Sequence, residues 1–262
     1  MNLAPLCRNP LRLMLLALLL TATAPLPAEE QNVAPGINRH YENTDYDEWV
    51  GVFESSGREV YDQRHRIVDA LNLKPGMHVA DVGAGTGLFT FLFARKVGTK
   101  GKVFAVDISD NFVRNIIKRG EKQGLRNIEG VVNTQKDTRL QSGSVELVFM
   151  SDTYHHFEYP QAMLHSIRQA LTPGGRMVIV DFRKQQGVSS GWVMSHVRAD
   201  RQTVIKEVEA AGFRLIEEPG LLQENYCLIF ARNGNQSRIQ IEMTAIIWSL
   251  AITSDITGKA DD

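Results

Sequence analysis

The sequence predicts an α/β protein in which helices cover both faces of a mostly parallel sheet. Two observations carry this prediction. Strand-like and helix-like segments alternate from residue 58 to residue 211, which is the pattern of parallel strands joined by helical crossovers. The first strand runs into Gly83, Gly85 and Gly87, which open a helix. Such a turn lets a ligand approach the backbone closely.

The elements are bounded by recognisable turn and cap residues. Ser109 or Asp110 can cap one helix, Pro160 suits a first helical position, and Gly124 and Gly212 suit helix ends. The predicted strands are 77–82, 102–107, 128–132, 145–151, 176–182, 213–217 and 225–231. The predicted helices are 58–71, 87–97, 109–123, 160–171 and 199–211, and residues 183–198 are predicted to be an irregular connection.

The first 28 residues differ from the rest of the chain. Arg8 and Arg12 precede an apolar stretch, and small residues follow as far as Ala28, which is the layout of a signal peptide. The sequence therefore predicts residues 1–28 to be a signal peptide and the protein to be periplasmic or secreted. The stretch of 12 residues from 13 to 24 is shorter than the roughly 20 needed to span a bilayer, so no stable membrane insertion is expected after cleavage. A membrane anchor and a cytoplasmic protein with an incorrectly placed start are the alternatives.

Three further segments make up the rest of the chain. Residues 29–57 are predicted to be an arm that ends in a short helix, with Trp49 and Phe53 one turn apart. They could cover a ligand as a lid or pack against the domain. Residues 58–232 are the predicted catalytic domain. The tail, residues 233–262, has no predicted role, although residues 239–252 are apolar enough for a packed element, a dimer contact or a strand.

Composition narrows the class of protein. The chain has 262 residues, of which 43% are hydrophobic and 23% charged, as in ordinary globular domains. The formal net charge of −1 provides no attraction to nucleic acid. Outside the predicted signal peptide the one cysteine is Cys227, within an apolar strand, so no intramolecular disulfide is expected and a buried, inert thiol is favoured.

Two carboxylates suggest the kind of ligand. Asp81 ends the first strand two residues before the first glycine, where it would repel a pyrophosphate but suit a ligand with an amino group or a positive charge. Asp107 ends the second strand, where a carboxylate can accept hydrogen bonds from ribose hydroxyls. Together they predict a nucleoside cofactor. The acid and the alternate spacing of the glycines both oppose a nicotinamide oxidoreductase.

Four blocks of sequence resemble the class I S-adenosylmethionine-dependent methyltransferases. The blocks are Asp-Val-Gly-Ala-Gly-Thr-Gly at 81–87, Val-Asp at 106–107, Ser-Val-Glu-Leu-Val at 144–148 and Leu-Thr-Pro-Gly-Gly-Arg at 171–176. The resemblance covers residues 58–231. It implies a Rossmann-like seven-stranded sheet of order 3-2-1-4-5-7-6 with strand 7 antiparallel, and S-adenosyl-L-methionine as cofactor.

The resemblance also implies roles for individual residues. Asp107 would accept the ribose hydroxyls, Ile108 would pack on adenine, and Asp137 or the Gln135 amide would contact the adenine edge, because the first residue after the third strand is not an acid. Asp152 is placed with the cofactor-binding residues. The methionine portion would be held by Asp81, Gly83, Ala84, Gly85 and Gly87.

The loop after the fourth strand is the predicted reaction centre. His155 or His156 could be a general base and Tyr154 could orient the acceptor, although one histidine could instead cap the next helix and the other lie in solvent. No third ligand lies near the His-His pair in sequence, so no metal is predicted. Arg58, Trp192, His196 and Arg198 could shape the acceptor pocket or be ordinary structural and solvated residues.

The predicted function is S-adenosylmethionine-dependent methyl transfer to a small or medium-sized molecule. Nucleic-acid amino-methyltransferases carry two prolines in the loop after the fourth strand, and the stretch 152–154 has none, so a nucleic-acid partner is not expected. The alternative is an exported cofactor-binding protein of the same fold without turnover. The sequence indicates neither the acceptor atom nor the oligomeric state.

Overall fold

The computed structural model describes residues 29–41 and 45–233. The predicted signal peptide and residues 234–262 of the predicted tail lie outside the described residues. From Gln31 onward the described residues belong to one compact unit. Within the described part of the chain, no helix combines the length and the apolar character that a membrane crossing requires.

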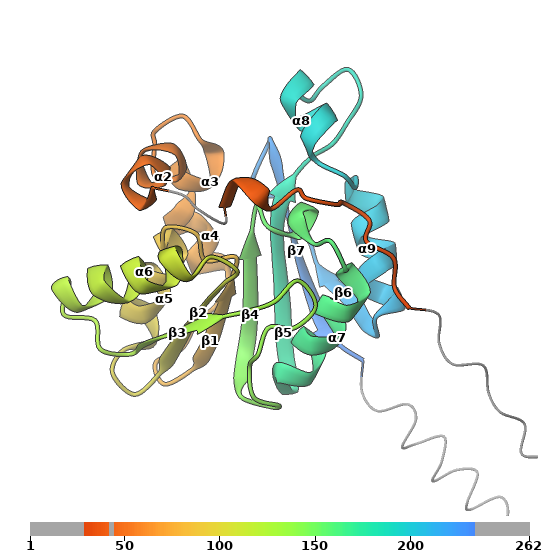
Figure 1. Cartoon of the computed structure of the whole chain (residues 1–262). Helices are drawn as coiled ribbons and strands as arrows, with labels where there is room; N and C mark the ends of the chain where they lie inside the picture. The colour runs from red at the N-terminus through yellow and green to blue at the C-terminus, as the bar shows by residue number, and fades with distance from the viewer. Residues whose placement is uncertain (1–28, 42–44, 234–262) are drawn as a thin grey trace, which may run out of the picture. The chain divides into compact units, whose positions relative to one another are not determined.

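A seven-stranded sheet of order β3-β2-β1-β4-β5-β7-β6 forms the centre of the domain (Figure 1). Strand β7 is antiparallel to β5 and β6, and the other neighbouring pairs are parallel. The predicted strand order and the antiparallel seventh strand are therefore confirmed. The strands are β1 His78–Val82, β2 Lys102–Asp107, β3 Ile128–Val132, β4 Val145–Ser151, β5 Leu171–Phe182, β6 Phe213–Glu217 and β7 Asn225–Arg232.

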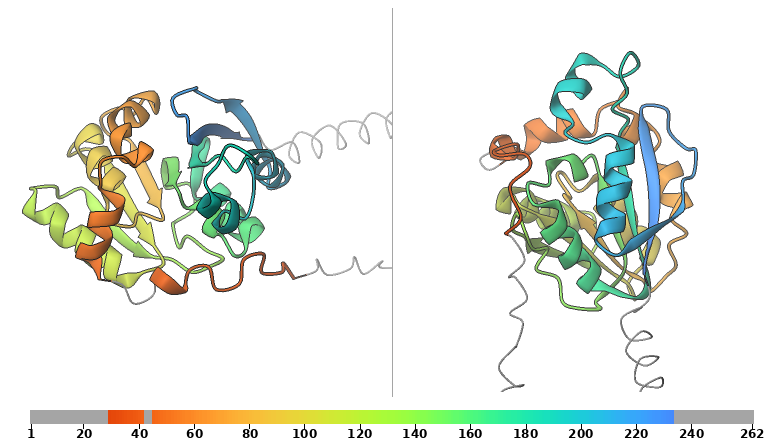
Figure 2. Two further views of the ribbon diagram at one scale, coloured as in Figure 1. Left: turned by 90° about the horizontal axis from the view of Figure 1, so that it is seen from above. Right: turned by 90° about the vertical axis from the view of Figure 1, so that its right-hand side faces the viewer.

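Helices lie on both faces of the sheet (Figure 1, Figure 2). Because side chains alternate along a strand, Leu147 and Phe149 of β4 pack in the core cluster with α4 and α5, whereas Val148 and Met150 pack with α7 and α9. The helices are α2 Tyr46–Phe53, α3 Glu59–Asp62, α4 Arg64–Ala70, α5 Leu88–Val97, α6 Asp110–Lys122, α7 Pro160–Ala170, α8 Gly191–His196 and α9 Arg201–Ala210.

The local structure differs from the prediction in four places. Strand β5 begins at Leu171 and not at the expected residue 176. The helix expected over 58–71 is divided at Gln63 into α3 and α4. Part of the connection expected to be irregular forms α8, in which Ser190 accepts a hydrogen bond from the Val193 amide at the N-cap. Two single-turn 3₁₀ helices, η1 (Arg39–Tyr41) and η2 (Tyr154–His156), were not expected either.

Other predictions are confirmed in detail. Ser109 is the N-cap of α6 and accepts a hydrogen bond from the Phe112 amide. Pro160 occupies the first turn of α7. Cys227 is a free, buried thiol whose pKa burial raises to about 12, which fits an inert core residue.

Candidate functional site

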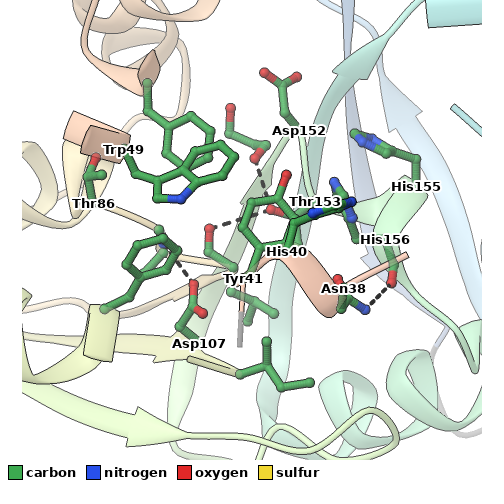
Figure 3. Close-up of a pocket in the computed structure, with 18 of the residues that line it drawn as sticks. Asn38, His40, Tyr41, Trp49, Thr86, Asp107, Asp152, Thr153, His155 and His156 are labelled. Carbon is green, nitrogen blue, oxygen red and sulfur yellow. Dashed lines mark hydrogen bonds between the residues drawn. The ribbon is translucent and has the colours of Figure 1, made fainter. Parts of the chain in front are cut away.

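A cavity of about 870 Å³ lies at the carboxyl ends of β1, β2 and β4. Its walls come from the turns after these strands, from η1 and α2 of the arm, and from α8. Figure 3 shows Asp107 on one side of the cavity and His155 and His156 on the other, with Tyr41 between them. Ligands of open α/β sheets bind at this edge of the sheet.

The glycine turn forms the floor of the cavity. Gly83 has a φ of +73°, and a Cβ placed on it would lie 2.3 Å from Oγ1 and Cγ2 of Thr153. Gly83, Ala84 and Gly85 line the cavity as expected. Gly87 does not: it is the N-cap of α5, and a Cβ there would meet Phe91 and Ile116. The predicted cofactor contact of Gly87 is therefore replaced by a role in starting and packing the helix.

Two buried carboxylates belong to the floor. Asp107 Oδ2 accepts a hydrogen bond from the Gly85 amide at 2.8 Å, and Oδ1 accepts one from the Ser109 amide at 2.9 Å. Burial raises the pKa of Asp107 to about 6 despite these bonds. Asp81 accepts a hydrogen bond from Thr90 Oγ1 at 2.6 Å, and burial raises its pKa to about 7. Both groups can therefore bind or release a proton near neutral pH.

The wall after β3 corrects the expected adenine contact. Asp137 is exposed and lies outside the cavity, where its Oδ1 accepts hydrogen bonds from the Arg139 amide and from Ser166 Oγ. Gln135, the expected alternative, does line the cavity. So does Asn133, whose buried Oδ1 has no hydrogen-bond partner within residues 29–41 and 45–233. Asn133 is the residue that sequence reasoning set aside because it is not an acid.

Asp152 joins the N-cap of α3 to the sheet. It has a φ of +48°, and its Oδ2 lies 2.6 Å from Nη2 of Arg58. Its Oδ1 accepts a hydrogen bond from Asn225 Nδ2 at 2.7 Å. Burial raises the pKa of Asp152 although Arg58 opposes this. Asp152 therefore links Arg58 and Asn225 while it lines the cavity, and its predicted contact with the cofactor stays a prediction.

The arm both packs on the glycine turn and lines the cavity. Tyr46 donates a hydrogen bond to the Thr86 carbonyl at 2.6 Å. The rings of Tyr41, Trp49 and Phe53 form a row, with neighbouring centroids 4.9 Å and 4.8 Å apart, and all three line the cavity. The arm is therefore packed against the domain, and its residues also line the cavity; its covering of a ligand as a lid stays a prediction.

Histidines form the opposite end of the cavity. His155 Nδ1 lies 2.7 Å from Oδ1 of Asp181, and the His155 amide donates to Oδ2 of the same carboxylate. Burial lowers the pKa of His155, but the Asp181 charge and hydrogen bond outweigh it and raise the pKa. Burial lowers the pKa of His156 to about 2, helped by His155 and His196. The general-base role stays a prediction, for which only His155 has an orienting carboxylate.

Tyr154 does not fit its predicted role in orienting the acceptor. Its side chain is fully buried, its hydroxyl donates to Glu207 Oε2 of α9 at 2.7 Å, and Arg198 lies over its ring. It lies outside the cavity lining. Arg198, for which the sequence left a pocket role and an ordinary structural role open, pairs with the same Glu207.

Replacing Tyr154 by phenylalanine should therefore lower stability without changing cofactor binding. The free energy of unfolding is expected to fall by about 1 kcal/mol, the usual worth of one lost side-chain hydrogen bond. Thermal unfolding with and without S-adenosylhomocysteine checks both parts. A large loss of affinity in a variant that melts normally would restore Tyr154 to the site.

Comparison with known proteins identifies the family. Residues 73–234 match the family described as "Methyltransferase domain", and the chain belongs to this family of S-adenosylmethionine-dependent methyltransferases. It is 27% identical over 133 residues, half of the chain, to nocamycin O-methyltransferase of Saccharothrix syringae, and 28% identical over 125 residues, 47% of the chain, to a ubiquinone/menaquinone biosynthesis C-methyltransferase of Shewanella sp.. The alignments span 48% and 49% of those proteins, about half their length.

A solved structure agrees in both sequence and fold. An S-adenosylmethionine-dependent methyltransferase from Aquifex aeolicus is 26% identical, with a TM-score of 0.62, and the match covers 72% of this chain and 98% of that one. The cofactor is S-adenosylmethionine. The residues present fit it: Gly83 leaves no room for a Cβ beside Thr153, a carboxylate ends β2, and the cavity is also lined by Asn133, whose Oδ1 has no partner among the described residues.

Proposed function

We propose that the protein is a methyltransferase that transfers the methyl group of S-adenosylmethionine to a small or medium-sized molecule bound in the same cavity. The observation that carries the proposal is the continuity of this cavity. One continuous cavity is lined by the glycine turn and Asp107, and also by His155, His156 and Trp192. Donor and acceptor can therefore be held next to each other in one cavity, whose lining includes residues of the arm.

The cofactor supplies a methyl group already activated on a sulfonium sulfur. In the proposed arrangement Asp107 accepts the ribose hydroxyls, Ile108 packs on adenine and Asn133 Oδ1 accepts from the adenine amino group. Asp81 and the turn at 83–85 hold the methionine portion. The support for these roles is their position in the cavity and, for Asn133, the buried oxygen without a partner.

The acceptor end favours a flat or apolar molecule. Tyr41, Trp49, Phe182 and Trp192 bring aromatic rings to the lining, and the Phe182 and Trp192 centroids lie 5.5 Å apart. Aromatic walls contribute apolar area and ring stacking to ligand binding. The named relatives, an O-methyltransferase and a quinone-pathway C-methyltransferase, support a small acceptor without indicating the atom methylated here.

Transfer of labelled methyl groups tests the function. The purified protein is incubated with methyl-labelled S-adenosylmethionine and a panel of phenols, quinols, amines and thiols, and S-adenosylhomocysteine is quantified. Product above the rate without acceptor supports the proposal. Tight cofactor binding with no product from any acceptor would favour the alternative, a binding protein without turnover.

Export of the protein is a separate part of the proposal. The basic and apolar pattern of residues 1–28 supports a periplasmic or secreted protein, which would need a supply of cofactor outside the cytosol. Fusing residues 1–30 to a reporter that is active only in the periplasm tests this localisation. Reporter activity is expected, and its absence would favour an anchored or cytoplasmic protein.

Cofactor affinity should increase with pH between 5 and 8. At pH 5 a carboxyl with a pKa of about 6 is about nine-tenths protonated, and protonated Asp107 no longer attracts two hydroxyl donors, so affinity should fall about tenfold for this group alone. The raised pKa values also mean that the folded chain holds protons that the unfolded chain releases near pH 4. The ligand-free protein should therefore lose stability as pH rises from 4 to 7. Calorimetric titration with S-adenosylhomocysteine between pH 5 and pH 8 checks the predicted rise in cofactor affinity, and an affinity that stays constant over these pH values contradicts it.

A further inference from the structure

Three histidines from two separate segments meet at the acceptor end of the cavity. His155 and His156 come from η2, and His196 comes from the end of α8. One ring nitrogen of each lies within 4.8 Å of a ring nitrogen of the other two. The sequence argument against a metal was that the pair has no third ligand nearby, and the fold brings His196 to that place.

The hydrogen bonding of His155 and His156 is typical of histidines that bind a metal ion. Asp181 holds His155 through Nδ1, which leaves Nε2 as the available nitrogen. A carboxylate behind a histidine orients the ring and increases its basicity toward a metal. His156 Nδ1 is buried without a hydrogen-bond partner among the described residues. A buried imidazole nitrogen without a partner is costly, and a bound ion would satisfy it.

The third histidine, His196, lies where its ring can move closer to the rings of His155 and His156. His196 is partly exposed and its ring stacks on Trp192, with centroids 4.6 Å apart. The His196 ring centroid lies 5.2 Å from the centroids of both His155 and His156. Ligands of a tetrahedral zinc ion lie roughly 3.3 Å from one another, so rings moving inward by about an ångström would close the site.

We propose that His155, His156 and His196 bind one divalent metal ion of the zinc class and leave a coordination position open to the cavity. Imidazole ligands suit zinc and its transition-metal neighbours rather than magnesium or calcium, and three protein ligands with one open position are the pattern of catalytic rather than structural zinc sites.

The role of the ion rests on the proposed function. The open position would receive an oxygen or sulfur atom of the acceptor. Coordination stabilises the anionic form of that atom, and its proton passes to solvent. In this arrangement the metal, rather than an imidazole acting as general base, keeps the acceptor deprotonated.

Metal content tests the site independently of turnover. The full chain is dialysed against a chelator, loaded with Zn²⁺, freed of excess ion and analysed for zinc by mass spectrometry. Wild type should retain about one zinc per chain, and His196→Ala and His156→Ala should each lose at least nine-tenths of it. His65→Ala, which changes an exposed histidine on α4, is the matched control and should retain the metal. Substitution with Co²⁺ should give the intense visible absorption of a tetrahedral site in wild type and not in His196→Ala.

Cofactor affinity separates this proposal from the proposed function. His196→Ala should bind S-adenosylhomocysteine as wild type does and melt at a similar temperature, since His196 lies on a short surface helix. Wild-type protein that takes up no zinc, or His196→Ala and His156→Ala proteins that both retain it, would overturn the metal site. Neither result would affect the cofactor site, which fails only if S-adenosylhomocysteine does not bind.

Discussion

Replacing Gly83 by alanine is expected to weaken cofactor binding more than a hundredfold. It should also lower the free energy of unfolding by about 3 kcal/mol, because overpacking costs about 1–3 kcal/mol and so does a left-handed backbone at a non-glycine residue. The added Cβ would lie 2.3 Å from two Thr153 atoms and 2.8 Å from its Cβ. Thr153 cannot rotate all three away, and its hydroxyl already donates to the Ser151 carbonyl. The turn or the loop after β4 must therefore move, and both line the cavity.

Gly124 provides a matched control for this substitution. Its φ of +74° is almost the same as that of Gly83, but a Cβ there meets nothing within 4 Å. Gly124→Ala should cost only the backbone strain, about 1 kcal/mol, and leave affinity unchanged. Adding Thr153→Gly to Gly83→Ala removes the clashing atoms and should restore part of the affinity. Calorimetry and thermal unfolding of the four proteins would contradict this account if Gly83→Ala behaved like Gly124→Ala.

Replacing Asp107 by alanine is the second change expected to have a large effect. The carboxylate holds the Gly85 and Ser109 amides in place, and it is the proposed partner of the ribose hydroxyls. Two lost charge-assisted hydrogen bonds, at about 1.5 kcal/mol each, correspond to a decrease in cofactor affinity of about a hundredfold or more. Titration calorimetry with S-adenosylhomocysteine measures the loss directly.

An exposed carboxylate near Asp107 serves as the control. Asp110 begins α6 and pairs with Arg114 at the surface. Asp110→Ala should bind the cofactor within about twofold of wild type, because exposed ion pairs contribute little. Equal affinities for the two variants would show that the carboxylate at the end of β2 does not hold the ribose.

The sheet could be predicted because its signals are local. Each strand is a short apolar run bounded by glycine, proline or a capping residue, and the strand order follows from the family that the four blocks indicate. Within the floor of the cavity, Asp81, Gly83 and Asp107 lie where the sequence placed them, since a strand end and its following turn fix their positions. The division of the 58–71 helix at Gln63 has no such local signal.

The rest of the site depends on contacts that are distant in sequence. Asp137 was expected at the adenine edge, but its hydrogen bond with Ser166 of α7 holds it outside the cavity. Tyr154 and the two histidines are consecutive, and a 3₁₀ turn rotates each by about 120° from the last, so Tyr154 enters the core while the histidines line the cavity. The sequence offered His196 as a pocket residue, but its closeness to the two histidines could not be predicted because α8 lies in a segment without periodic sequence.

The central claim is that one cavity of this chain holds the cofactor with its sulfur toward the histidines. A crystal structure of the protein with S-adenosylhomocysteine tests it most directly. We expect the ribose hydroxyls on Asp107, the adenine amino group at Asn133 Oδ1, and the sulfur open to the space before His155 and His156. A ligand bound elsewhere, or one whose sulfur faces away from these histidines, would contradict the account.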